Sequence, residues 1–364
     1  MSGKKGIYYT QAKGILKITG HTPNWSLVVG AGVSYPIFPS WKDLIKLMYT
    51  NLYKTKTTQE IDNMIESFPL DSILQSLKNF SQLDDSNFSS ILSQTLYTKL
   101  WSSLRPRERN DVFKVLANPV PGAFPDSIWE SFFVTMKDNY RTETFYKLAE
   151  VLLKGYIKGI TPASVISFNA EALLHTTLAS LIREHYGRNK KHAEKVKQKL
   201  DIVTRSISVS IEDRIPFYHI HGYLPVPFLN TKVKKSLASL DKLVFSENDY
   251  LNLANSSFNW QSSIFLHASY TNSLVFIGLS FSDINLRKWL SWTYSNRLKE
   301  IQQFNPAINP ISPSSKHYWI RTRPKTATEE SLLENNVAHL GVRIIWIDSY
   351  SQIADALAIL TGIK

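Results

Sequence analysis

The chain has 364 residues, of which 43% are apolar and 20% are charged, and it carries a formal net charge of +12. This length allows one large domain or two modest ones, and the composition argues against widespread disorder. Cysteine is absent, which excludes disulfides, thiol nucleophiles and zinc sites built on thiolates. No apolar run reaches the roughly 18 residues that span a bilayer, and no signal-peptide core follows the N-terminal lysines. We therefore expect a cytoplasmic protein with no membrane contact.

Six short apolar runs predict β-strands, because each is bounded by turn residues. Near-continuous apolar runs of this kind suit strands that are buried on both faces, as in a parallel sheet. The predicted strands are 26–29, 164–168, 216–220, 273–278, 316–321 and 342–347.

Helical patterns separate these strands. Apolar residues recur at helical spacing in 169–186, and Asp283 is an N-cap residue at the start of the next helix. A third helix has a capping box from Thr326 to Glu329 and stops at Gly341, and a last one covers 351–360. Alternating strands and helices predict a Rossmann-like, doubly wound α/β fold with a mostly parallel six-stranded sheet.

The range 42–160 breaks this alternation, since it has helical segments but no convincing strand. We interpret it as a helical subdomain inserted after the first strand, within a single domain over 1–364. Such a subdomain suits gating, partner docking or substrate covering, or it only enlarges the core.

Much of the positive charge lies in two segments, 183–200 and 232–242. One interpretation is an electrostatic surface for nucleic acid. The other is a solvated helical face, because Ala193, Val196 and Leu200 recur at helical spacing among the charges. We expect a basic helical excursion over 183–205, and nucleic-acid contact through it stays open.

A glycine turn follows the first predicted strand. Gly30 and Gly32 stand between that strand and a helix that begins near Trp41. Such a strand–turn–helix lets backbone amides approach a pyrophosphate, helped by the helix dipole. Tyr35 occupies the place of the third glycine of the dinucleotide fingerprint, so the turn alone leaves a cofactor site and a plain buried strand exit both open.

Three further groups of residues stand at ends of predicted strands, where parallel sheets bind ligands. Asn169 ends the second strand, and it is either a cap or a ligand group. His219 and His221 alternate along a strand, and His221, just before Gly222, is better placed for a cleft and for general-base work. In the turn at 278–285, Ser280 and Asp283 suit either ribose binding or helix capping.

The order of these motifs resembles the sirtuin-like superfamily. The motifs are GAGVS with FPSW, VISFNAEALL, YHIHGY, FSENDY and FIGLSFSDINL. They look most like the zinc-free branch found in bacterial antiviral defence, the Thoeris-type and related NAD-consuming effectors. The resemblance runs from about Trp25 to the C-terminus, without the helical insertion and the basic segment. The family often has Tyr-Asp after the asparagine, whereas this chain has Ala170 and Glu171.

The resemblance implies roles for particular residues. The first glycine turn would contact NAD through Gly30, Ala31, Gly32 and Ser34, and the second turn through Gly278, Ser280 and Asp283. The catalytic pair would be Asn169 and His221.

The resemblance also implies an NAD glycohydrolase with NAD as substrate and no zinc, acting by abortive infection. Restraint would come from a homo-oligomer or from a sensor or ATPase partner. A catalytically silent NAD or ADP-ribose sensor, a nucleic-acid-associated subunit and an NAD-dependent protein deacylase are the alternatives.

Overall fold

The computed structural model describes residues 24–54, 58–119, 123–187, 200–203, 215–229, 243–256, 259–304 and 316–363. Most of the two basic segments lies outside these ranges, so nucleic-acid contact stays a prediction. Among the described residues, no helix combines the length and apolar character needed to cross a membrane.

The strands form one seven-stranded sheet in the order β3-β4-β2-β1-β5-β6-β7. The pairs β1–β5, β3–β4, β5–β6 and β6–β7 are all parallel, which confirms the doubly wound α/β architecture. The bounds are β1 (Trp25–Val29), β2 (Ser164–Ser167), β3 (Leu200–Val203), β4 (Ile215–His219), β5 (Ser273–Ile277), β6 (His317–Thr322) and β7 (Val342–Ile347).

Six of these strands lie on the predicted apolar runs, and β3 is the seventh. It lies in the range 183–205, for which we expected a helical excursion. A short Leu-Asp-Ile-Val run at the sheet edge pairs in register with β4, and strand pairing there outweighs the helical spacing of the preceding charged residues.

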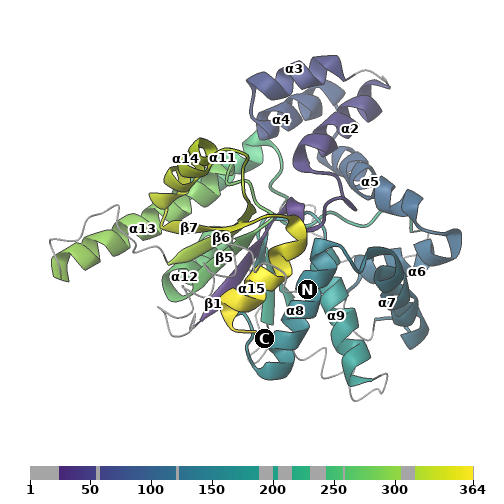
Figure 1. Ribbon diagram of the computed structural model, residues 1–364. Coiled ribbons are helices and arrows are strands. Elements are labelled where there is room, and N and C mark those ends of the chain that lie inside the picture. The colour runs from purple at the N-terminus through teal and green to yellow at the C-terminus, as the bar shows by residue number, and fades with distance from the viewer. Residues whose placement is uncertain are drawn as a thin grey trace. The chain divides into compact units, whose positions relative to one another are not determined.

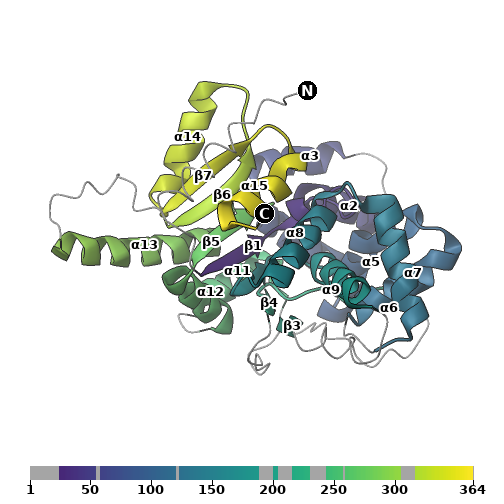
Figure 2. The same ribbon diagram turned by 60° about the horizontal axis from the view of Figure 1, so that its bottom comes forward.

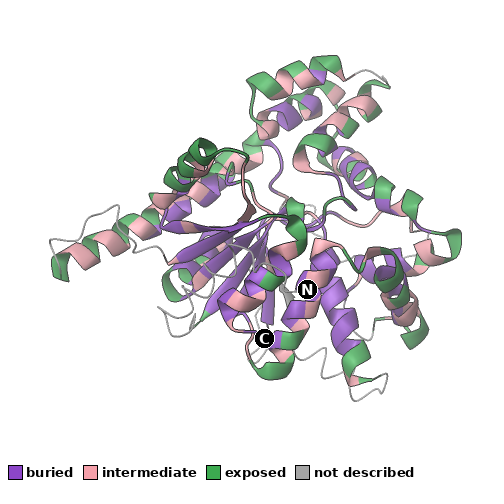
Figure 3. Ribbon diagram, in the orientation of Figure 1, coloured by how far each residue is buried: buried purple, intermediate pink, exposed green. Residues whose placement is uncertain are grey.

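The chain divides into two compact units. The first unit combines Met1–Val29, Glu150–Ile166 and Phe258–Lys364, and the second combines Gly30–Ala149 and Ser167–Ser257. Strands β1, β5, β6 and β7 belong to the first unit, and their side chains are almost all buried (Figure 3).

The helices of the first unit are α12 (Trp260–Thr271), α13 (Ile284–Phe304), α14 (Ala327–Ala338) and α15 (Ile353–Thr361). Three of them, α13, α14 and α15, lie on predicted helical patterns, and α12 was not predicted. Figure 1 shows α15 in front of the strands, and α13 running out past the end of the sheet. Asp283 caps α13 through its Oδ1, which accepts from the amides of Asn285 at 2.8 Å and Leu286 at 3.0 Å. Thr326 caps α14 through the amide of Glu329.

The described part of the range 42–160 contains helices joined by turns, and no strand. It holds α2 (Trp41–Tyr53), α3 (Gln59–Ser67), α4 (Leu70–Ser81), α5 (Asp85–Ser103), α6 (Pro106–Ala117), α7 (Asp126–Tyr140) and α8 (Thr144–Lys158). Helices α2 to α7 lie in the second unit, together with α9 (Leu173–Tyr186) and α11 (Glu247–Asn255). They pack through buried aromatic and aliphatic side chains such as Tyr97, Phe113 and Phe132.

Candidate functional site

The glycine turn leaves β1 as a short 3-10 turn at the start of the second unit. Gly30 is buried and extended, Ala31 and Gly32 are exposed, and Ser34 is 1% exposed. The hydrogen bonds that close the turn use the amides of Val33, to the Gly30 carbonyl, and of Ser34, to the Ala31 carbonyl. Two exposed small residues ahead of helix α2 suit close approach of a phosphate group.

Ser34 connects this turn to the residues that follow β2. Its hydroxyl donates to Glu171 Oε1 at 2.6 Å, and Asn169 Nδ2 donates to the same carboxylate oxygen at 3.0 Å. Asn169 Nδ2 also lies 3.4 Å from Ser34 Oγ. The glycine turn and the asparagine loop are therefore joined by a buried hydrogen-bond cluster, which we name the Ser34–Asn169–Glu171 cluster.

The cluster fixes which end of the Asn169 side chain is available. Because the Nδ2 group is used inside the cluster, the Oδ1 atom is the remaining polar atom. Asn169 is 4% exposed, and its Oδ1 meets no hydrogen-bond donor among the described residues. A buried acceptor left unsatisfied is costly, so this atom is suited to receive a hydrogen bond from a ligand or a water.

Glu171 is the centre of the cluster. Its second oxygen, Oε2, accepts from the amide of Leu173 at the start of α9, a place where a helix favours negative charge. Burial raises the pKa of Glu171, and its hydrogen bonds with Ser34, Leu173 and Asn169 oppose that rise. Glu171, which stands in the Tyr-Asp position of the resembling family, thus supports the asparagine loop directly.

His221 lies after β4, and backbone hydrogen bonds hold its loop beside the asparagine loop. The Ile220 amide donates to the Ser167 carbonyl at 3.2 Å, and the Leu224 amide donates to the Ala170 carbonyl at 2.8 Å. Gly222 follows His221 with φ 73°, a conformation that favours glycine. The His221 ring is 4% exposed.

Two aromatic rings flank His221. Phe168 lies 4.8 Å and Tyr250 lies 5.4 Å from it between ring centroids, both edge-on. Sequence patterns did not single out either ring, although Tyr250 ends the FSENDY motif. Edge-to-face packing on two sides restricts how far the imidazole can turn.

His219 is a core residue, as its alternation with His221 allows. It is 2% exposed and packs against Tyr223 at 5.4 Å. Burial lowers its pKa to about 4, against a smaller opposing effect of the Asn169 backbone. A histidine that stays neutral through the physiological range, inside the core, is poorly placed for proton transfer.

The second turn lies in the first unit, after β5. Gly278 has φ 70° and is half-buried, Ser280 is exposed, and Asp283 is half-buried as the cap of α13. Phe281 has φ 60°, which is unfavourable for a large side chain. Its ring is held by Phe276 at 4.9 Å and Trp319 at 4.6 Å. Such a conformation, fixed by packing, is typical of turns at functional sites.

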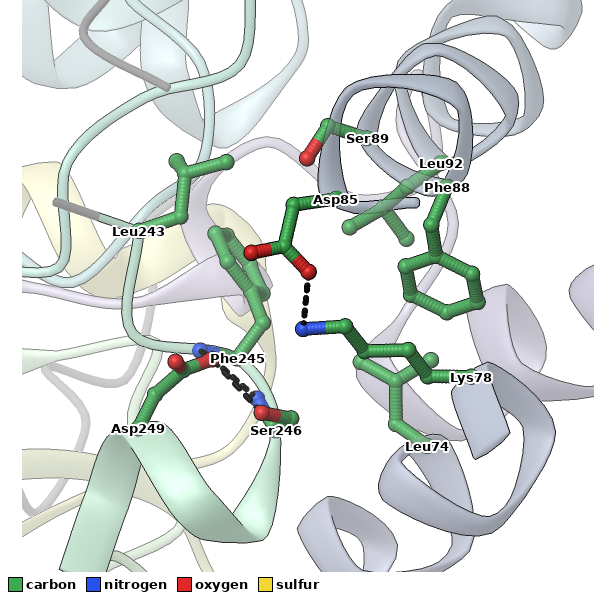
Figure 4. Close-up of a pocket in the computed structure, with 10 residues that line it drawn as sticks. All are labelled: Leu74, Lys78, Asp85, Phe88, Ser89, Leu92, Leu243, Phe245, Ser246 and Asp249. Carbon is green, nitrogen blue, oxygen red and sulfur yellow. Dashed lines mark hydrogen bonds and ion pairs between the residues drawn. The ribbon is translucent and has the colours of Figure 1, made fainter. Parts of the chain in front are cut away.

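A small cavity in the second unit lies between α4, α5 and the segment before α11 (Figure 4). Its volume is about 70 Å³, far below the roughly 300–1,000 Å³ of small-molecule sites. Lys78 and Asp85 pair across it at 2.7 Å, and Asp249 caps α11 beside it by accepting from the amide and hydroxyl of Ser246. This cavity is too small for a dinucleotide, and the hydrogen bonds of Asp249 beside it hold the FSENDY segment.

The described residues contain no group of three or more histidine, cysteine, aspartate or glutamate side chains that could hold a metal ion. In the Ser34–Asn169–Glu171 cluster, Glu171 Oε1 accepts from the Ser34 hydroxyl and from Asn169 Nδ2.

Comparison with known proteins gives one informative result. No curated protein matches this chain. Residues 171–343 match the family model of the SIR2-like domain, a range that includes Glu171, His221 and the turn at Gly278. SIR2-like domains bind NAD as substrate, and both units contribute to the matched range. The match and the parallel α/β sheet support the sirtuin-like superfamily for this chain.

Proposed function

We propose that this protein is an NAD glycohydrolase, which cleaves NAD to nicotinamide and ADP-ribose. The observation that carries the proposal is the Ser34–Asn169–Glu171 cluster, which links the glycine turn to the asparagine and leaves Asn169 Oδ1 as the open acceptor. The SIR2-like match to residues 171–343 supports NAD as the ligand.

In this proposal the nicotinamide–ribose bond breaks first, and its electron pair leaves with nicotinamide. Asn169 Oδ1 accepts a hydrogen bond from the attacking water or from a ribose hydroxyl and so holds it in line, which is a positioning role. Water then bonds to the ribose carbon, and His221 accepts the proton as general base. The amides of Ala31 and Gly32 bind the pyrophosphate.

We place the adenosine side of NAD at the second turn, with Gly278, Ser280 and Asp283 as its contacts. The half-buried Asp283 carboxylate accepts the two amides that cap α13, so its orientation is fixed without any ligand. Ser280 and Ser282 share a hydrogen bond of 2.6 Å on the exposed surface of the turn.

The first test is product analysis after incubation of the purified protein with NAD. The parent should release equal amounts of nicotinamide and ADP-ribose, or its cyclic form. Asn169→Ala and His221→Ala should each lower the rate by roughly 10²–10⁴-fold, the usual effect of losing a positioning group or a general base. His219→Gln, a core histidine outside the proposed chemistry, is the matched control.

Two outcomes would contradict the proposal. If His221→Ala cleaves NAD as fast as the parent, His221 is not the base. If the parent binds NAD without turnover, whatever oligomer or partner is present, the protein is a sensor and not a hydrolase. NAD-dependent release of an acyl group from an acyl-lysine peptide would instead favour the deacylase.

We further propose that NAD depletion serves antiviral defence through abortive infection. Support comes from the resemblance of the motif order to zinc-free defence effectors and from the lack of cysteine. Unregulated NAD cleavage would kill the host, so we expect control through a homo-oligomer or through a sensor or ATPase partner. Expression of the parent and of Asn169→Ala in phage-infected cells, with cellular NAD measured over time, tests this role.

A further inference from the structure

The first unit contains a cavity of about 310 Å³ that none of the sequence motifs indicates. Its walls come from the last turn of α12, the second half of α13 and the residues at the starts of β6 and β7. Helix α12 packs against both α13 and β5, and Figure 2 shows it below β5. The Gly278 turn follows the opposite end of β5, and a five-residue strand spans roughly 16 Å. The cavity is therefore separate from the Gly278 turn, although both lie in the first unit.

Two cations face this cavity from different elements. Arg297 projects from α13, and Lys316 precedes β6. The Nη1 atom of Arg297 is buried and meets no hydrogen-bond acceptor among the described residues. A buried guanidinium donor without an acceptor is costly, because its lost hydration is not replaced.

The hydrogen-bond partners of Lys316 among the described residues are both backbone carbonyls. Its Nζ donates to the carbonyls of Ser269 and Tyr270 at the C-terminal end of α12, where a cation is favoured by the helix dipole. Burial, with the nearby charge of Arg297 as the smaller cause, lowers the pKa of Lys316 to about 8. Two like charges thus line one cavity, and neither forms an ion pair with an acid among the described residues.

The remaining polar walls do not neutralise this pair. Glu300 follows Arg297 by three residues on α13, and no ion pair within 4 Å joins it to Arg297 or Lys316. His317 is 5% exposed and uses Nδ1 to accept from the Leu274 amide, and burial lowers its pKa to about 3. The described walls therefore carry two positive charges and one negative charge.

Tyrosines complete the cavity. The Tyr294 ring lies so close to Gly341 that a Cβ at Gly341 would come within 2.6 Å of it, and Gly341 has φ 72°. Only glycine allows both the backbone conformation and this contact. The Tyr270 hydroxyl accepts from Asn296 Nδ2 at 2.9 Å, and both tyrosines line the cavity together with the cations.

We propose that this cavity binds a small organic phosphate of about mononucleotide size. A guanidinium offers a planar pair of donors that matches phosphate oxygens, and an ammonium adds a point charge. Phosphate oxygens supply the acceptor that Arg297 Nη1 lacks. A volume of about 310 Å³ is at the lower end of small-molecule sites, and the tyrosine rings pack against a sugar or a base.

Isothermal titration calorimetry at constant ionic strength tests the proposal, with inorganic phosphate, ribose 5-phosphate and AMP as separate probes of the full-length protein. We expect the two organic phosphates to bind more tightly than inorganic phosphate. Arg297→Gln should weaken their binding at least tenfold. Glu300→Gln should strengthen it by about two- to fivefold, because it removes the only carboxylate of the described walls.

Lys299→Gln is the matched control, since this exposed lysine is on the same helix outside the cavity, and its affinity should change less than twofold. Lys316→Gln should also weaken binding. The thermal unfolding midpoint of this variant shows whether the lost contacts at the end of α12 have also destabilised the protein. The proposal is wrong if no probe binds, or if Arg297→Gln binds as the parent does.

Discussion

At the scale of single residues, Glu171 connects most of the candidate site. One carboxylate accepts from a serine of the glycine turn, from the asparagine side chain and from the first amide of α9. Burial of this carboxylate costs free energy, and three hydrogen bonds offset that cost. Its role is therefore positional: it holds the turn and the asparagine in one fixed arrangement.

Glu171→Gln tests this role. Glutamine has the same size as glutamate, but its NH₂ group replaces one acceptor oxygen and would face a hydrogen-bond donor. We expect the free energy of unfolding to fall by about 1–3 kcal/mol, the cost of an unsatisfied buried group. NAD cleavage should fall at least tenfold through kcat, since Asn169 loses its fixed orientation. Urea unfolding and steady-state kinetics measure the two effects.

Ser34→Ala is the comparison for this variant. It removes one donor and leaves the bond between Asn169 Nδ2 and Glu171 Oε1 in place, so the loss of stability should be smaller, about 1 kcal/mol. Equal kcat values for Glu171→Gln and the parent would show that the cluster is structural only.

At the scale of elements, the start of α11 matters because that helix holds Tyr250 against His221. Asp249 Oδ2 accepts from the amides of Phe245 and Ser246 and from the Ser246 hydroxyl. This cap sets where the helix begins, and Tyr250 is the next residue after Asp249. The FSENDY motif thus positions His221 indirectly, because its cap fixes the helix that carries Tyr250.

Asp249→Ala should lower stability by about 0.5–2 kcal/mol, the usual cost of a lost cap, and also slow NAD cleavage. Thr326→Ala is the matched control, since it removes the cap of α14 in the first unit at a similar cost. Thermal unfolding and kcat are measured for both variants. If both lose stability and both keep the parent's kcat, α11 does not position His221.

The sequence predicts most elements because their signals are local. Six apolar runs predict six strands, and the caps at Asp283 and Thr326 predict helix starts that the structure confirms. The sequence patterns did not predict strand β3, because its four residues follow a charged segment with helical spacing. The Ser34–Glu171 bond joins residues 137 positions apart, and no local pattern carries such a contact.

At the scale of the whole molecule, both units keep histidines neutral in their cores. Burial lowers the pKa of His175 to about 3 and of His219 to about 4 in the second unit, and of His317 to about 3 in the first. In an unfolded chain each imidazole takes a proton near pH 6.5. The unfolded state therefore binds more protons than the folded state between pH 6.5 and about 4.

Stability should therefore fall as the pH falls through that window, by up to about 1.4 kcal/mol per pH unit for each buried histidine. Glu171 acts in the opposite direction, because its raised pKa lets the folded state keep a proton above pH 4.5, and lowering the pH there adds stability. Three histidines outweigh one carboxylate, so we expect net destabilisation by acid. Urea unfolding at pH 8, 7, 6 and 5 measures the slope.

His175→Leu identifies the source of the slope. Neither ring nitrogen of His175 meets a hydrogen-bond partner among the described residues, and the ring packs on Phe217 at 4.9 Å. An apolar side chain of similar size therefore loses no hydrogen bond to the described residues and cannot take up a proton. The variant should match the parent most closely at pH 8 and exceed its stability at pH 5, because one protonation of the unfolded state has been removed. A stability difference between variant and parent that stays constant from pH 8 to pH 5 would mean that buried His175 does not contribute to the acid sensitivity.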